Sequence, residues 1–164
     1  MLQGLAAGEV PSELNFQFHH QPFAFFKRYA PNSEAGRNHL QDLQRLEEDL
    51  ADGRPLKPVS FIKFGGKNNE HPGYTAILTS EQKASDLVRR IQAHPDYANT
   101  LIVITYDEGG GHWDHVPPPV IDRWGPGVRI PAILISPFAR RGYVDHEQYE
   151  TVSILRMIEE RFRS

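Results

Sequence analysis

Apolar residues recur at helical spacing in three parts of the chain. Leucines alternate with charged residues over Asn38–Ala51, which predicts an amphipathic helix there. The segment Thr79–Gln82 has the pattern of a capping box, and apolar residues then line one face of a second helix. A closing helix is expected over Thr151–Phe162. Its apolar residues, which are expected to be buried, are Val152, Leu155, Ile158 and Phe162.

Three shorter apolar runs predict strands. Leu101–Tyr106 is rich in β-branched residues, as is typical of a strand that is buried on both faces. Val59–Lys63 precedes a Gly-Gly turn, and Ile130–Ser136 follows a long loop rich in Pro and Gly. Strand, helix and strand in this order form a βαβ unit, and such units make parallel sheets. We therefore expect an α/β fold with a largely parallel central sheet flanked by helices.

Two unusual loops begin where the expected strands end. Phe64–Gly73 follows the first strand, and Asp107–His115 follows the second. In open parallel sheets, ligands bind beyond the carboxyl ends of the strands. The βαβ unit is expected to bring both loops to one edge of the sheet, so that residues far apart in sequence meet there.

The adjacent acidic residues Asp107 and Glu108 predict a metal site. Two carboxylates at the end of a buried strand repel each other unless a cation neutralises them. Hard divalent cations and zinc accept carboxylate oxygen, and the glycines that follow let the backbone approach a ligand closely. Asp114 and His115 offer further ligands. An acidic strand end with a flexible turn explains the pair alone, but the whole run Asp107–His115 favours a divalent metal ion of unknown identity.

Three histidines are candidates for contact with a substrate. Proline fixes the backbone after His71, so the imidazole has a preset direction and could donate to a phosphate oxygen or protonate a leaving group. A loop histidine that caps a turn is an equally good interpretation. His19 and His20 lie in an aromatic segment that suits a partly desolvated pocket. An aromatic core segment with histidines at its rim explains that segment by itself.

The other basic side chains give weaker signals. His39, His94 and His146 lie in helical or connecting contexts, and we expect them at the surface. Arg129 could pair with a carboxylate of the site or with the surface, and the sequence leaves both open. Gly65-Gly66-Lys67 is not a P-loop, because the first glycine and the Ser or Thr of that motif are missing.

Composition narrows the class of protein. The chain has 164 residues, of which 39% are hydrophobic and 24% charged, as in an ordinary globular domain. A net charge of −3 gives no reason to expect nucleic acid as a partner, and no apolar run approaches the length of about 20 residues that crosses a bilayer. Without cysteine, any metal ligands are oxygen and nitrogen atoms. Residues 1–15 lack a signal peptide, and we expect them to be a non-native or poorly ordered start.

Four stretches of the chain together carry a family resemblance. They are Phe18-His19-His20-Gln21-Pro22-Phe23, Glu70-His71-Pro72-Gly73, Thr105–Gly111 with Asp114-His115-Val116, and Arg129-Ile130-Pro131 leading into Ser136-Pro137-Phe138. The Asp-Glu-Gly-Gly-Gly motif is specific, and the other stretches become specific in combination. From about Phe16 onward, the chain resembles the C-terminal part of the phosphoesterase family of bacterial acid phosphatases and phosphatidylcholine-type phospholipases C.

The resemblance implies an alkaline-phosphatase-like fold and a set of functional residues. Asp107 and Glu108 match metal ligands. His20 and His71 match catalytic histidines that contact the phosphate group, and we assign His19 and the residue His115 of the Asp-His-Val stretch to substrate binding. A periplasmic or secreted location is implied for the family.

The chain departs from the family pattern at two motifs. Family members carry an N-terminal Glu-Asn pair that binds the metal and a Ser or Thr nucleophile, and neither is found here. We therefore expect residues 16–164 to be the C-terminal portion of a phosphoesterase domain whose N-terminal half is missing. The expected function is metal-assisted hydrolysis of phosphate esters, with this chain supplying part of the site. The alternative is a non-catalytic fragment that binds metal or phosphate, and a sulfatase is a weaker third reading.

Overall fold

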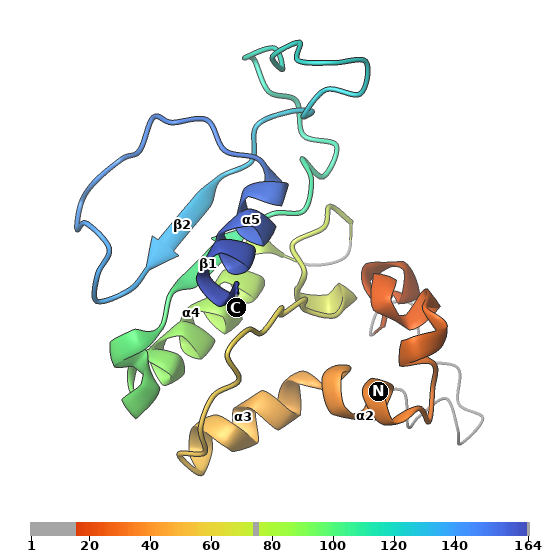
Figure 1. The fold of residues 1–164 in the computed structure, drawn as a ribbon. Coiled ribbons are helices and arrows are strands. Elements are labelled where there is room, and N and C mark those ends of the chain that lie inside the picture. The colour runs from red at the N-terminus through yellow and green to blue at the C-terminus, as the bar shows by residue number, and fades with distance from the viewer. Residues whose placement is uncertain (1–15, 74–75, 164) are drawn as a thin grey trace. The chain divides into compact units, whose positions relative to one another are not determined.

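The computed structural model of the protein describes residues 16–73 and 76–163. It divides into two compact units, Met1–Ala98 and Asn99–Ser164 (Figure 1). The helices of the first unit are α2 (Glu34–His39), α3 (Leu43–Ala51) and α4 (Ile77–Gln92), with 3-10 turns at Phe18–His20, Pro22–Phe25, Lys27–Tyr29, Gly66–Asn68 and Pro95–Asn99. The second unit contains strands β1 (Ile102–Thr105) and β2 (Ala132–Ile135) and helix α5 (Thr151–Phe162). The chain thus combines helices with a small sheet, and the start expected over residues 1–15 lies outside the described residues.

Helix α4 supplies the core of the first unit. Leu87 and Ile91 are buried one helical turn apart, which confirms the apolar face that the sequence predicts. The predicted capping box at Thr79 is wrong, because the helix begins at Ile77. The Thr79 N–H donates to the Ala76 carbonyl oxygen at 3.1 Å, so this residue lies inside the first turn.

The single helix expected over Asn38–Ala51 is two helices. Helix α2 ends at His39, and Leu40 has an extended backbone with φ −99° and ψ 92°. Helix α3 starts again after Asp42, which occupies the N-cap in the β region that this residue type favours. Asn and His are weak helix formers, and their position before Leu40 agrees with a break there.

The strand expected over Val59–Lys63 is absent from the described structure. This segment has no strand partner among the described residues, and a strand exists only through the hydrogen bonds of its ladder. The chain is fastened just before this segment instead, where the Leu56 N–H donates to Asp96 Oδ2 at 2.9 Å. The expected βαβ unit therefore lacks its first strand.

His94 is buried, so its expected surface position is wrong. Its side chain is 2% exposed, and Nδ1 accepts the Asp96 N–H at 3.2 Å. Because the Asp96 carboxylate also accepts the Leu56 N–H, the end of α4 and the segment after Leu56 are joined at this corner. The helical periodicity of the sequence gives no sign of this, since it depends on a contact 40 residues away.

The sheet of the second unit is antiparallel, and no parallel pair occurs among the described residues. Ile102 of β1 lies opposite Ile135 of β2, and Thr105 lies opposite Ala132. The strands were expected at these places, but the expected parallel arrangement is not what the described part of the chain forms. Strand β1 is half-buried, not buried on both faces, because a two-stranded sheet has too few neighbours to cover both sides.

Helix α5 has the bounds that the sequence predicts. It starts with a reciprocal capping box, in which Glu150 accepts the Ser153 N–H and the Ser153 hydroxyl accepts the Glu150 N–H. The expected burial of its apolar face is not found, because Val152, Leu155 and Phe162 are exposed. Within the described ranges, no helix is both long and apolar enough to span a membrane.

We predict that stability depends on the buried face of α4. Leu87→Ala should lower the free energy of unfolding by about 2–4 kcal/mol, because it removes buried methyl groups and leaves a cavity. Leu78→Ala is the matched control, since Leu78 lies in the same helix and is 79% exposed. Its effect should stay below about 0.5 kcal/mol. Urea unfolding of both variants measures this, and equal losses would show that α4 does not supply the core.

Candidate functional site

The residues after β1 form a tight turn that depends on glycine. Glu108 Oε2 accepts the Gly110 N–H at 2.5 Å, and the His112 N–H donates to the Gly109 carbonyl oxygen at 2.9 Å. Gly110 and Gly111 have φ values of +61° and +76°, which side chains disfavour. The turn therefore directs Glu108 back over its own backbone. The tight turn expected at these glycines is confirmed, whereas their expected close approach to a ligand stays a prediction.

Val128 reaches the same turn from the far end of the loop. A Cβ atom on Gly109 would lie 2.5 Å from Cγ2 of Val128, so the two segments touch only because this residue is glycine. No motif or periodicity in the sequence singles out Val128. This contact brings residues 19 positions apart together beside the acidic pair.

Asp114 is the most heavily bonded side chain of this loop. Oδ2 accepts a hydrogen bond from Nε of Arg129 at 2.8 Å, and Oδ1 accepts one from Nη2 of Arg129 at 3.0 Å. Oδ1 also accepts a hydrogen bond from the Val116 N–H at 3.0 Å. These donors, Arg129 first, hold the pKa of the Asp114 carboxyl well below its usual range, and Asp114 in turn raises the pKa of Arg129. Of the two partners that the sequence left open for Arg129, the structure selects the carboxylate.

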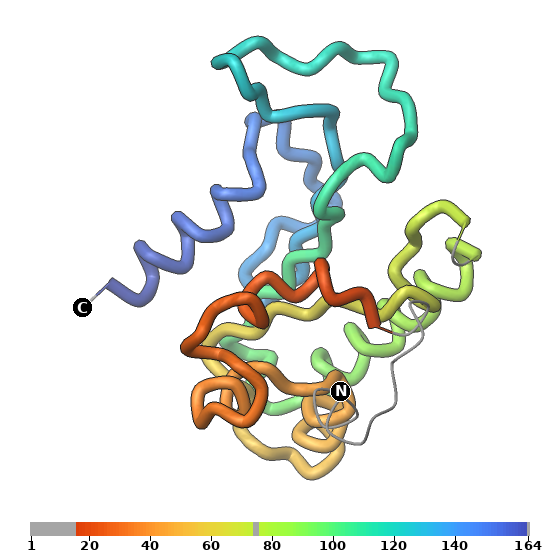
Figure 2. Tube along the Cα trace, turned by 90° about the vertical axis from the view of Figure 1, so that its right-hand side faces the viewer, coloured from red at the N-terminus to blue at the C-terminus, as the bar shows by residue number. Residues whose placement is uncertain are grey.

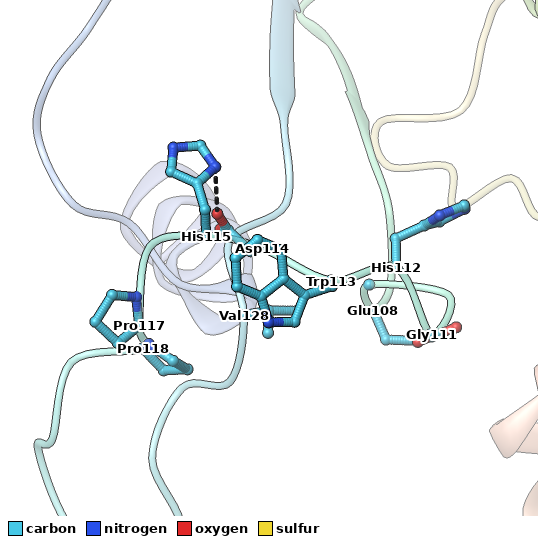
Figure 3. A pocket seen from close by; sticks show the side chains of 10 residues that line it. Glu108, Gly111, His112, Trp113, Asp114, His115, Pro117, Pro118 and Val128 are labelled. Carbon is cyan, nitrogen blue, oxygen red and sulfur yellow. Dashed lines mark ion pairs between the residues drawn. The ribbon is translucent and has the colours of Figure 1, made fainter.

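A hollow of about 580 Å³ lies along this loop. Its lining includes Glu108, Trp113, His115, Pro117 and Val128 (Figure 3). Trp113 is 85% exposed, and Nδ1 of His115 lies 3.8 Å from Oδ1 of Asp114. Figure 3 shows the His112 imidazole pointing away from His115, so the two histidines face different sides. The hollow places the expected ligand Glu108 and the expected substrate-binding residue His115 on one surface.

The acidic pair itself is exposed to solvent. Asp107 and Glu108 are both in the exposed class, so the expected penalty of burying two carboxylates does not apply in this unit. No group of three or more His, Asp or Glu side chains that could hold a metal ion occurs among the residues the structure describes. Their oxygen donors suit a hard divalent cation, but two residues are fewer than such an ion takes. Asp114, named as a further ligand, has its oxygens engaged by Arg129 and Val116.

The candidate histidines of the first unit lie on two segments that are hydrogen-bonded to each other. The Asn69 amide donates to the Gln17 side-chain oxygen at 2.8 Å, although the two residues are 52 positions apart. Gln17 is buried. It precedes His19 and His20, whose rings meet edge to face with centroids 4.3 Å apart. The segment of His71 is thereby tied to the segment of His20, through residues that the sequence did not identify.

His71 is exposed and held by its own turn. Its N–H donates to Asn69 Oδ1 at 3.0 Å, and Nδ1 lies 2.8 Å from the Pro72 carbonyl oxygen. A carbonyl oxygen only accepts, so Nδ1 carries the proton of this contact. His71 thus caps a turn, as one of its two interpretations from the sequence expects, while its contact with a substrate stays a prediction. The predicted meeting of His71 with Asp107 stays a prediction, and the βαβ unit from which it was argued is not found.

We predict that Arg129→Ala raises the pKa of Asp114 toward the ordinary range of a carboxyl. The rise should be incomplete, because the Val116 N–H still donates to Asp114. Asp122 is the matched control, since the N–H groups of Gly125 and Trp124 lower its pKa without help from an arginine. Carbon NMR titration of both carboxyls measures the effect. An unchanged Asp114, or an equal rise at Asp122, would contradict the ion pair.

The same ion pair sets a direction for pH dependence. The folded pKa of Asp114 is lowered, so its stabilisation is fully present above the unfolded pKa of about 4. It is lost as the pH falls below that value toward the folded pKa. In the Arg129→Ala variant this loss should be smaller, since less stabilisation is present to lose. Unfolding curves recorded between neutral pH and acid compare the two proteins.

Comparison with known proteins relates the chain to a family of enzymes. The model of the Phosphoesterase family matches residues 7–163. Non-hemolytic phospholipase C of Pseudomonas aeruginosa is 26% identical over 93% of this chain and 27% of its own length. Phospholipase C B of Mycobacterium tuberculosis is 28% identical over 84% of the chain and 31% of its own length. Non-specific phospholipase C3 of Arabidopsis thaliana is 34% identical over 56% of the chain and 21% of its own length.

These matches cover a much larger share of this chain than of the relatives. The chain spans at most 31% of each of the three relatives, yet the family model covers nearly all of it. The stretches that carry the resemblance, from Phe18 to Phe138, all fall inside the matched range. This confirms the family predicted from sequence, and the chain belongs to the Phosphoesterase family.

Proposed function

We propose that the complete enzyme hydrolyses phosphate esters in the manner of a phospholipase C and that this chain supplies part of its site. The observation that carries the proposal is the turn after β1. It presents the adjacent carboxylates Asp107 and Glu108 beside a hollow and is tied at Asp114 to Arg129. The family and its phospholipase C relatives make a phosphate ester the natural substrate for such a site.

Asp107 and Glu108 would hold a divalent metal ion of unknown identity. Their carboxylate oxygens suit a hard cation, and further ligands would come from parts of the enzyme outside this chain. When bound, such an ion neutralises phosphoryl charge and activates a hydroxyl nucleophile. Asp114 would act on the loop alone, because Arg129 and the Val116 N–H occupy its oxygens.

His20 and His71 would contact the phosphate group as catalytic residues. With Nδ1–H donating to the Pro72 carbonyl oxygen, His71 would contact the substrate through Nε2. In the protonated state this nitrogen can give its proton to a leaving oxygen. His19, beside His20, and His115, beside Asp114, would help to bind the substrate.

Residues 16–164 would be the C-terminal portion of an α/β domain of the alkaline-phosphatase-like type. A largely parallel central sheet would then be completed by strands from the N-terminal half, which would also carry the nucleophile. The similarity to phospholipases C favours a substrate of the phospholipase C type over a substrate of the acid phosphatase type. A periplasmic or secreted location would follow from the family.

A second function is a non-catalytic fragment that binds metal or phosphate. The observation that favours it is that the described residues provide no cluster of three ligands. The chain also spans only 27% of the Pseudomonas aeruginosa relative. In this reading Asp107 and Glu108 would bind a cation weakly and no turnover would occur.

We predict that the double variant Asp107→Ala, Glu108→Ala loses most of the divalent metal binding of the chain, at least tenfold in affinity. Two carboxylates supply both the charge and the oxygen donors of the site. The matched control is Asp145→Ala, Glu147→Ala, which removes two acidic residues from another exposed loop of the same unit. Titration calorimetry with Mg²⁺, Ca²⁺, Mn²⁺ and Zn²⁺ measures the affinities. Equal binding by wild type and the Asp107, Glu108 variant would refute the ligand assignment.

We predict that hydrolysis of p-nitrophenyl phosphate, where the purified chain shows it, requires the acidic pair. With divalent metal present, Asp107→Ala should abolish turnover, and Asp145→Ala should leave it unchanged. Release of p-nitrophenol is followed by absorbance. Turnover that survives Asp107→Ala would refute this chain's catalytic role, while metal binding without turnover would support the non-catalytic function.

A further inference from the structure

The connection between β1 and β2 carries large apolar side chains that the second unit does not cover. Val120 is 96% exposed, Trp124 is 79% exposed, and Ile121 is also exposed. This connection stands out from the sheet of its own unit in both views (Figure 1, Figure 2). Three large apolar side chains exposed within five consecutive residues are typical of an interaction surface. We call residues 115–128 the apolar loop.

The apolar loop is closed at its base and shaped within. The bidentate pair of Asp114 with Arg129 joins its two ends, and the Thr105 hydroxyl donates to the Pro131 carbonyl oxygen at 2.9 Å just outside them. At the tip, Asp122 Oδ1 accepts the N–H groups of Trp124 at 2.7 Å and Gly125 at 2.9 Å. The loop therefore has a defined conformation that presents Trp124, although it has no regular secondary structure.

The backbone of the apolar loop is unsuited to joining a protein sheet. Pro117, Pro118 and Pro119 are consecutive and lack N–H groups, so a strand of another protein could not pair with this stretch. The exposed strand β2 is different, since its backbone could take a further strand. The apolar side chains of the loop thus call for a partner that needs no backbone hydrogen bonds.

The charges of the apolar loop fit the boundary between lipid and water. Asp122 is its single acidic residue, and its carboxylate is turned onto backbone amides, which lower its pKa. The guanidinium of Arg123 lies 4.4 Å from the centroid of the Trp124 ring. Trp with an adjacent Arg is suited to a membrane surface, where the indole sits at headgroup level and the cation meets phosphate.

The apolar loop and the candidate site share residues. Pro117, Pro118 and Val128 line the hollow together with Glu108 and Trp113. A surface that binds the tip of the loop would therefore lie next to the hollow in which a phosphate ester would bind. We propose that the apolar loop inserts Val120, Ile121 and Trp124 into the surface of a phospholipid bilayer. The inference deepens the proposed function and rests on it for the substrate, which would be drawn from the same bilayer.

The two tryptophans of the chain report on the proposed contact directly. Trp113 precedes the apolar loop and Trp124 lies at its tip, so tryptophan fluorescence, excited selectively at the red edge of the absorption band, comes from this region alone. Vesicles of phosphatidylcholine with added phosphatidylserine are titrated into the full chain without metal. The tryptophan emission should move to shorter wavelength, and bilayer lipids brominated on their acyl chains should quench it. A free headgroup, phosphocholine, should cause neither change.

The double variant Val120→Ser, Ile121→Ser should weaken vesicle binding by roughly tenfold to a hundredfold, because it removes two apolar side chains from the insertion. The matched control is Phe138→Ser, Val144→Ser, which removes two exposed apolar residues of the same unit outside the loop. It should bind vesicles like wild type. Both positions of the loop variant are exposed, and circular dichroism checks that each variant keeps its fold.

Four results would overturn the proposal. They are no shift of the emission with vesicles, an unchanged affinity of the loop variant, an equal loss in the control variant, and the same shift with phosphocholine alone. A shift that grows with protein concentration without vesicles would show that the loop covers a protein surface instead. Failure of vesicle binding with intact hydrolysis of p-nitrophenyl phosphate would refute this inference alone. Vesicle binding without metal binding or turnover would refute the proposed function and leave the lipid contact.

Discussion

The bidentate ion pair between Arg129 and Asp114 determines the conformation of the chain between the two strands. It joins residues on either side of a long connection, and the Asp114 carboxylate also accepts the Val116 N–H. Planar guanidinium and carboxylate groups pair in one orientation, so the bond fixes direction as well as distance. Asp114 of this pair lines the hollow beside Glu108, and Trp124 lies in the stretch of chain that the pair closes.

The second structural constraint is the scarcity of buried apolar residues. Leu87 and Ile91 of α4 are the buried apolar residues in the described parts of the chain, whereas α5 and β2 expose theirs. Hydrogen bonds between polar groups therefore hold much of the loop structure in place. Gln17 with Asn69 and Asp96 with the Leu56 N–H each join segments about 40 to 50 residues apart. Such contacts fix geometry, while the hydrophobic term that usually dominates stability is small here.

The candidate site also shows how an acidic pair differs from a metal centre. Asp107 and Glu108 lie at the end of a strand, but they are exposed and the described residues add no third ligand nearby. A cation gains affinity from the number and charge of its ligands, so a pair alone holds it weakly. The glycines after the pair serve two needs at once. They permit left-handed backbone at Gly110 and close approach of Val128 to Gly109.

The sequence alone predicted the family, two strands over 101–106 and 130–136 that the structure forms over 102–105 and 132–135, the bounds of α5 and the glycine turn after β1. These features depend on neighbours within a few residues, which periodicity and motif spacing record. Tertiary structure decided the other features, because each of them depends on partners far along the chain. It paired β1 and β2 antiparallel, gave residues 59–63 an irregular backbone in place of the expected strand, buried His94, and selected Asp114 as the partner of Arg129.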